Sequence, residues 1–147
     1  MTKVIVQGKA RGLVLKTSNP INFLGAVDKQ TGIIHDKKHD IFEKSIKDSV
    51  LVFPHGVGSS VGAYTIYSLK SHQSAPLAMI CQKADLTVAS GCALANIPMV
   101  IVSPEKFNSI QDGAKIEIDT NSTTIINYFS NTPVSVILLP PVGRTLT

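Results

Sequence analysis

The stretch SVLVFPHGVGSSVGAYTIYSLK, residues 49–70, joins three signals that together indicate an α/β fold. Residues 49–54 are a short run of β-branched and aromatic residues, which is typical of a buried strand. Glycines then crowd around the pair Ser59-Ser60, and residues 60–70 space their apolar side chains as one face of a helix does. The stretch therefore predicts a strand, a tight turn and a helix.

The same pattern recurs in the next part of the chain. Residues 75–82 read as a strand, residues 84–97 as a helix that Asp85 can cap, and residues 98–103 as another strand. Asn96 marks the end of that helix. A βαβαβ run of this kind implies parallel strands with helices packed on them.

Both ends of the chain indicate more β-structure. Residues 3–17 predict one or two strands with a turn near residues 8–12, and residues 114–129 predict a hairpin after a connection over 104–113. A last apolar run is terminated by Pro140-Pro141. We expect a compact α/β domain in which the central βαβαβ run is flanked by β-strands.

Residues 19–48 form a long segment without a clear period. The segment is rich in Pro, Gly, Asn and Asp, and its turn signals begin at Asn19-Pro20. It is too long for a simple connection, and long ordered loops often carry function.

The composition suits a single globular domain spanning residues 1–147. Hydrophobic residues make up 44% of the chain and charged residues 16%. No apolar run has transmembrane length and the first residues lack a secretory signal, so we expect a cytoplasmic protein without a membrane partner. The net charge of +4 comes with scattered lysines and 5% aromatic residues. This pattern disfavours nucleic acid and suits an anionic small molecule or an acidic partner.

The two cysteines, Cys81 and Cys92, both lie among apolar neighbours. Their spacing matches no zinc or iron-sulfur pattern. We interpret them as buried structural thiols and predict no metal site on this chain.

The glycine-serine turn is compatible with several kinds of site. Glycines before a helix N-terminus suit an anion, but no Lys-Ser or Lys-Thr follows Gly62, which excludes a Walker loop. A dinucleotide fingerprint lacks its acidic ribose partner. A hydrolase elbow does not match either, because two residues separate Ser59 from Gly62.

Two interpretations of the serines stay open. In the first, the residues only form a tight turn, with Ser59 or Ser60 capping the helix. In the second, the Ser59 hydroxyl is a proton acceptor or nucleophile, because backbone N–H groups at a helix N-terminus stabilise an alkoxide. His55 is close enough in sequence to be its partner.

Four segments together resemble a known family. INFLGAVDKQTGII, VLVFPHGVGSSVGAYTIYSLK, APLAMI and ASGCALANIPMV are similar, in order and spacing, to the small subunit of the aconitase X enzymes. That subunit is the detached swivel domain of the aconitase superfamily. The resemblance covers residues 19–102 strongly and the flanking strands loosely.

The resemblance implies a swivelling β/β/α domain that packs on a large catalytic subunit, forming a heterodimer. The large subunit would hold a 4Fe-4S cluster. The pair would dehydrate (R)-5-phosphomevalonate to trans-anhydromevalonate 5-phosphate in a mevalonate route to isoprenoids.

The resemblance also assigns site residues. The first serine of the Gly-Ser-Ser loop is the base in aconitases, and that position is Ser59 here. The other residues that would face the substrate belong to the same loop and to the preceding FLG loop: Gly58, Ser60, Asn22, Phe23, Leu24 and Gly25. Ser60 would either bind the substrate or cap the helix.

One position departs from the aconitase pattern. Aconitases place a carboxylate-binding arginine after the two serines, whereas this chain has Val61. The anchors for carboxylate and phosphate would then lie on the large subunit. Other hypotheses stay open: a subunit of a cis-3-hydroxy-L-proline dehydratase, a stand-alone phosphate or nucleotide binder, and a structural subunit without chemistry.

Overall fold

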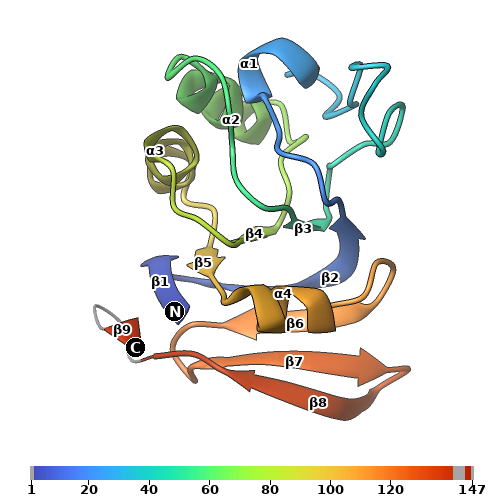
Figure 1. Cartoon of the computed structure of the whole chain (residues 1–147), viewed down its shortest axis with the longest axis vertical. Coiled ribbons are helices and arrows are strands. Elements are labelled where there is room, and N and C mark those ends of the chain that lie inside the picture. Colours follow the sequence, from blue (N-terminus) through green and yellow to red (C-terminus); the bar gives the residue numbers. More distant parts are fainter. Residues whose placement is uncertain (1, 141–144, 147) are drawn as a thin grey trace.

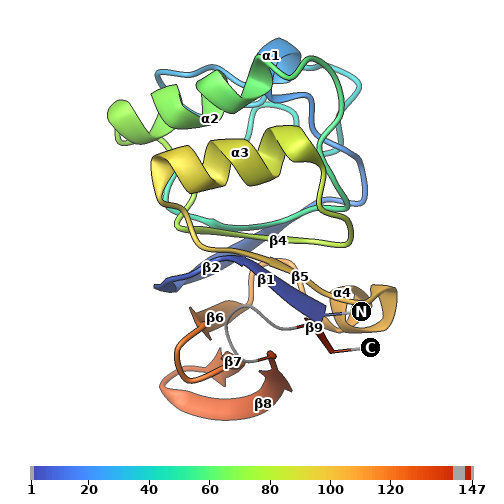
Figure 2. The same ribbon diagram turned by 90° about the vertical axis from the view of Figure 1, so that its left-hand side faces the viewer.

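The computed structural model describes residues 2–140 and 145–146, with a central parallel sheet between a helical layer and a second β layer (Figure 1). Four parallel strands form the central layer: β2 (Lys9–Lys16), β3 (Val50–Val52), β4 (Ala78–Cys81) and β5 (Met99–Ile101). Figure 2 shows the same order of layers from the side. The predicted α/β class and the β/β/α arrangement are confirmed.

Three helices lie on one face of the central sheet: α1 (Phe23–Ala26), α2 (Gly62–Ser71) and α3 (Leu86–Ala95). Because α2 joins β3 to β4 and α3 joins β4 to β5, the predicted βαβαβ run is confirmed. Asp85 caps α3 by accepting the Val88 N–H at 3.2 Å, and Asn96 ends that helix in a left-handed conformation, as predicted. Within residues 2–140 and 145–146, we find no helix that combines the length and the apolar character of a bilayer span.

Antiparallel strands extend the sheet on both sides of the parallel strands. On one side lie β6 (Lys115–Asp119), β7 (Thr124–Phe129) and β8 (Thr132–Leu138), and on the other lie β1 (Thr2–Val6) and β9 (Thr145–Leu146). The strand order is β8-β7-β6-β2-β3-β4-β5-β1-β9. The predicted hairpin is therefore confirmed as β6 and β7. The last apolar run is β8, which ends before Pro140, whereas Pro141 lies outside the described residues.

Two sequence-based expectations need correction. The turn expected over residues 8–12 lies at Gln7 and Gly8, and Gly12 belongs to β2. Residues 104–113, expected to be a connection, contain helix α4 (Pro104–Ser109). Ser103 caps this helix by accepting the Lys106 N–H at 3.3 Å, and a proline at the first helical position is compatible with the start of a helix.

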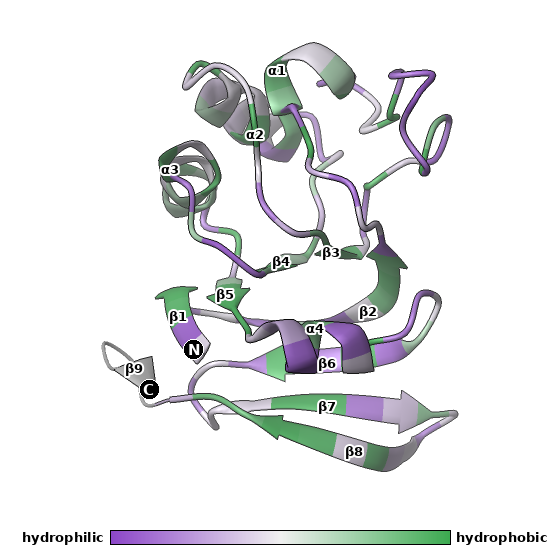
Figure 3. Cartoon of the chain, viewed as in Figure 1, coloured by the Kyte–Doolittle hydropathy of each residue, from purple (hydrophilic) through white to green (hydrophobic). Residues whose placement is uncertain are grey.

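The central strands are buried on both faces, which explains their unbroken apolar runs. Leu51 and Met79 belong to the core under the helices, whereas Val50 and Ile80 belong to the core that the second β layer and α4 cover. Each core is continuous from the strands to the layer that covers it. Figure 3 shows the hydrophobic colouring of β3 to β5, and also that much of β8 is hydrophobic.

Candidate active site

Two loops that are distant in sequence lie side by side beyond β3. The Ile21 N–H donates to the His55 carbonyl at 3.2 Å, and the Val57 N–H donates to the Ile21 carbonyl at 3.0 Å. Ile21 and Gly56 thereby form an isolated parallel bridge. The bridge brings together the two segments that the resemblance assigned to one site.

The side chain of Asn22 joins these loops. Its Oδ1 accepts the Gly25 N–H at 3.0 Å, which starts helix α1. Gly58 lies against the same amide group with φ +92°, and a Cβ atom there would lie 2.6 Å from Oδ1 of Asn22. Glycine is therefore required at this position both for its backbone conformation and for the close approach.

Ser59 follows at the start of the turn into α2. Its Oγ accepts the Val61 N–H at 3.1 Å, and its carbonyl accepts the Gly62 N–H at 2.9 Å. The hydroxyl is exposed. An N–H donor and the positive end of a helix dipole both favour negative charge on this oxygen, which is what a proton acceptor requires.

Ser60, Leu24 and Gly25 are also exposed. Phe23 lies in the core instead, where its ring meets that of Phe53 edge to face at 5.8 Å between centroids. Any contact of Phe23 with a bound molecule would therefore come from its backbone.

The interpretation of Ser59 or Ser60 as a helix cap is confirmed only for Ser59, whose hydroxyl accepts the Val61 N–H in the turn that leads into α2. Val61 occupies the N-cap position of α2 and makes no side-chain capping bond. Within the described residues, the Ser60 hydroxyl has no hydrogen-bond partner, which leaves it available to a ligand.

His55 does not approach Ser59 as a partner. Its Nδ1 lies 2.8 Å from the carbonyl oxygen of Gly56, so Nδ1 carries a proton and donates to that carbonyl. In the part of the chain that the structure describes, no hydrogen bond joins the two side chains.

Sequence reasoning found Asp85 as a helix cap but missed its link to the site. Its Oδ1 accepts the Gly56 N–H at 2.9 Å, while Oδ2 accepts from Val88. One carboxylate thereby ties the glycine-serine loop to the first turn of α3. The capping signal alone does not reveal the second bond, because Gly56 lies 29 residues away.

We expect Asp85→Ala to lower the free energy of unfolding by about 1–2 kcal/mol, because a cap is lost and the Gly56 N–H loses its acceptor. Urea denaturation measures the loss, and amide hydrogen exchange at Gly56 should become faster. Ser103→Ala is the matched control, since it removes the cap of α4 far from the loop. If exchange at Gly56 stays at the wild-type rate in Asp85→Ala, the carboxylate does not hold the loop.

Both thiols lie in the core, as predicted. Burial raises the pKa of Cys92 to about 12 and raises that of Cys81 well above its usual value. The Cys92 thiol lies 3.5 Å from the sulfur of Met79. Across residues 2–140 and 145–146, no three His, Cys, Asp or Glu side chains gather as metal ligands do.

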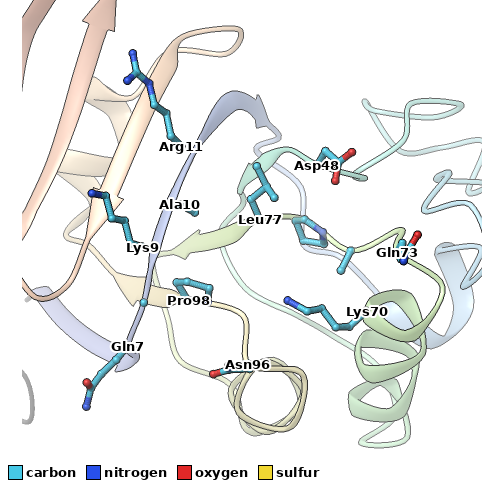
Figure 4. A pocket seen from close by; sticks show the side chains of 13 residues that line it. Gln7, Lys9, Ala10, Arg11, Asp48, Lys70, Gln73, Leu77, Asn96 and Pro98 are labelled. Carbon is cyan, nitrogen blue, oxygen red and sulfur yellow. The ribbon is translucent and has the colours of Figure 1, made fainter.

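A cavity of about 550 Å³ lies at the opposite edge of the sheet, away from the two loops (Figure 4). Its walls come from the C-terminal ends of α2 and α3, from the first residues of β2 and from the residues that precede β3, β4 and β5. The charged side chains among them are those of Lys9, Arg11, Asp48 and Lys70. Lys9 pairs with Glu117 at 3.7 Å, and the Arg11 guanidinium stacks over the Tyr128 ring. The helix ends at this cavity carry negative partial charge, whereas the serine loop lies at a helix N-terminus, which carries positive partial charge.

A β/β/α domain with an exposed Gly-Ser loop at a helix N-terminus has the architecture of a swivel domain. The sequence matches the aconitase X swivel domain over residues 1–127, and the chain belongs to this family.

Individual relatives agree with this assignment. The phosphomevalonate dehydratase small subunit of Methanosarcina acetivorans is 42% identical over 118 residues, which are 80% of this chain and 82% of that protein. The protein of the same name from Thermococcus kodakarensis is 43% identical over 118 residues, 80% of this chain and 87% of its own. The crystal structure of Thermococcus kodakaraensis aconitase X in its holo-form has a TM-score of 0.81 and 40% identity, and the match covers 86% of this chain and 95% of that one.

Proposed function

We propose that this chain is the small subunit of a dehydratase that converts (R)-5-phosphomevalonate to trans-anhydromevalonate 5-phosphate, with Ser59 as the proton acceptor. The observation that carries the proposal is the exposed Ser59 hydroxyl, which accepts a backbone N–H at a helix N-terminus and directly follows Gly58, the residue that lies against Asn22. The names of the relatives support the substrate. Residues 1–147 act together as one swivel domain in this proposal.

The reaction removes a proton and a hydroxide from neighbouring carbons. Ser59, in its alkoxide form, takes the proton from the carbon beside the carboxylate. The electron pair of that C–H bond forms the double bond, and the hydroxyl leaves from the next carbon. The Val61 N–H and the dipole of α2 stabilise the alkoxide before the transfer.

The remaining residues of the half-site position the substrate. The Asn22 amide, the Ser60 hydroxyl and the backbone around Gly58 and Gly25 offer hydrogen bonds to its polar groups. Residues 22–25 and 56–61 contain no lysine or arginine. The positive anchors for phosphate and carboxylate therefore belong to the large subunit in this proposal.

We place the 4Fe-4S cluster on that large subunit. The donor set of this chain does not fit a cluster, because its two thiols are buried in the core and held in the protonated form. When bound, such a cluster supplies a Lewis acid for the leaving hydroxyl.

The surface around Ser59 supports a partner that covers it. Large apolar side chains in α1, in the glycine-serine loop and at the starts of α2 and α3 are exposed: Leu24, Val57, Val61, Tyr64 and Leu86. Tyr64 is 69% exposed and Leu86 is 79% exposed. A large subunit that buries these apolar side chains also excludes water from Ser59. The exclusion of water strengthens the electrostatic interactions of the Ser59 hydroxyl.

We expect Tyr64→Glu combined with Leu86→Glu to prevent assembly with the large subunit, because two charges would have to be buried in an apolar contact. Co-purification and size-exclusion chromatography measure the loss, while circular dichroism of the variant should match the wild type. Phe129→Glu is the matched control, since this side chain is 75% exposed on β7. If the double variant assembles normally, the apolar side chains around Tyr64 and Leu86 are not part of the interface.

The decisive test is an assay of the chain co-expressed with its large subunit and reconstituted without oxygen. We expect the pair to dehydrate (R)-5-phosphomevalonate and the isolated chain to be inactive. If the pair dehydrates cis-3-hydroxy-L-proline and not (R)-5-phosphomevalonate, the proposed substrate is wrong. Activity of the chain without a partner would contradict the shared site.

A further inference from the structure

His39 lies buried within the long loop and contacts the segment that leads into the site. Its side chain is 5% exposed, and its Nε2 lies 3.0 Å from the carbonyl oxygen of Pro20. A carbonyl oxygen only accepts hydrogen bonds, so Nε2 must carry the proton. The contact therefore fixes the tautomer of the ring.

The other ring nitrogen has partners for both protonation states. Nδ1 lies 3.4 Å from the Ile41 N–H and 3.1 Å from Oδ1 of Asp40. A neutral ring accepts from Ile41, and a charged ring donates to Asp40. The Thr17 hydroxyl donates to the same Asp40 oxygen, which fastens this group to the end of β2. In either protonation state of the ring, the Nε2–H group donates to the Pro20 carbonyl.

Pro20 directly precedes the residues that hold the two site loops together. The next residue, Ile21, forms the bridge to His55 and Val57, and Asn22 then places its amide against Gly58. A shift of the Pro20 carbonyl would move Asn22 relative to Gly58, which directly precedes Ser59. Displacements of about 1 Å can cost about 100-fold in rate even when the change is distant from the reacting atoms.

We propose that His39 is a positioning residue for the dehydration, acting through the hydrogen bond from its Nε2–H to the Pro20 carbonyl. The catalytic part of this inference rests on the proposed function, whereas the structural part does not. In this proposal, His39 acts through the Pro20 carbonyl and not by contact with the substrate.

Two substitutions separate this hydrogen bond from the bulk of the side chain. In His39→Gln, the amide nitrogen can occupy the place of Nε2 and donate to Pro20. In His39→Asn, the shorter side chain reaches only the place of Nδ1. In the reconstituted pair, we expect His39→Asn to lower kcat about 10- to 100-fold with little change in KM. His39→Gln should keep most of the wild-type kcat. His72→Asn is the matched control, because His72 is exposed beyond the end of α2.

Nuclear magnetic resonance of the full-length chain gives a readout that does not need activity. Ring nitrogen shifts should show His39 protonated at Nε2, and the amide signals of Val57 and Gly58 should move in His39→Asn but not in His39→Gln. If the wild-type pair does not dehydrate phosphomevalonate, the proposed function fails while these signals still decide the structural part.

Three results would overturn the inference. The first is a ring protonated only at Nδ1. The second is wild-type kcat together with unmoved Val57 and Gly58 amides in His39→Asn. The third applies if His39→Asn does not fold. In that case, a folded His39→Gln variant that loses as much kcat as Ser59→Ala would overturn the inference.

Discussion

Ser59→Ala should lower kcat of the reconstituted enzyme by about 10²- to 10⁴-fold, the usual contribution of a positioned acid or base. Substrate binding should change little, because the loop backbone and Asn22 remain in place. The loop should keep its shape, since the Ser59 carbonyl still accepts the Gly62 N–H. Steady-state kinetics of the anaerobic pair measures both constants.

Two other serines separate the role of Ser59 from general effects. Ser60→Ala should raise KM more than it lowers kcat, because the Ser60 hydroxyl is offered to the substrate rather than to the reacting proton. Ser122→Ala removes an exposed hydroxyl from the turn between β6 and β7 and should leave both constants unchanged. A Ser59→Ala enzyme that keeps most of its kcat would assign the proton transfer to another residue.

Gly58→Ala should reduce kcat about 100-fold, although it adds only one methyl group. The residue has φ +92°, and the new Cβ would lie 2.6 Å from Oδ1 and 2.7 Å from Cγ of Asn22. Either Asn22 must leave its place as the cap of α1, or the loop that carries Ser59 must move. Both changes separate groups that the proposed reaction needs together.

Gly113→Ala is the matched control for this substitution. Gly113 also has a positive φ, +79°, but a Cβ there meets nothing within 4 Å. It therefore carries the same kind of backbone strain, about 1–2 kcal/mol, without a collision. Gly58→Ala should therefore lose more stability in urea than Gly113→Ala, and only Gly58→Ala should lose activity. Equal kcat values for the two variants would contradict a positioning role for the contact with Asn22.

The central βαβαβ run could be predicted from sequence because its signals are local. Residues 49–54 form an apolar run bounded by a glycine turn, and helix α3 has a capping residue at Asp85 and an end signal at Asn96. Helix α4 was missed because it spans only six residues, although Ser103 followed by Pro104 is a normal helix start. The antiparallel pairing of β2 with β6 joins distant residues, which no local pattern indicates.

The candidate site was predictable only in part for the same reason. Residue chemistry singled out Ser59, and the family resemblance added Asn22 and Gly58. The contact between Asn22 and Gly58, and the bond from Gly56 to Asp85, depend on how the layers pack. His39 gave no signal, since one histidine in a polar loop is ordinarily a surface residue.

The burial of both thiols makes the natural chain suitable for labelling at a single site. Native Cys81 and Cys92 are inaccessible to thiol reagents, since each lies in the core with its pKa raised by burial. A cysteine introduced at Tyr64 would then be the reactive sulfur of the folded chain. A fluorescent dye attached there would report in real time when the large subunit covers this face, and neither native cysteine would have to be removed first.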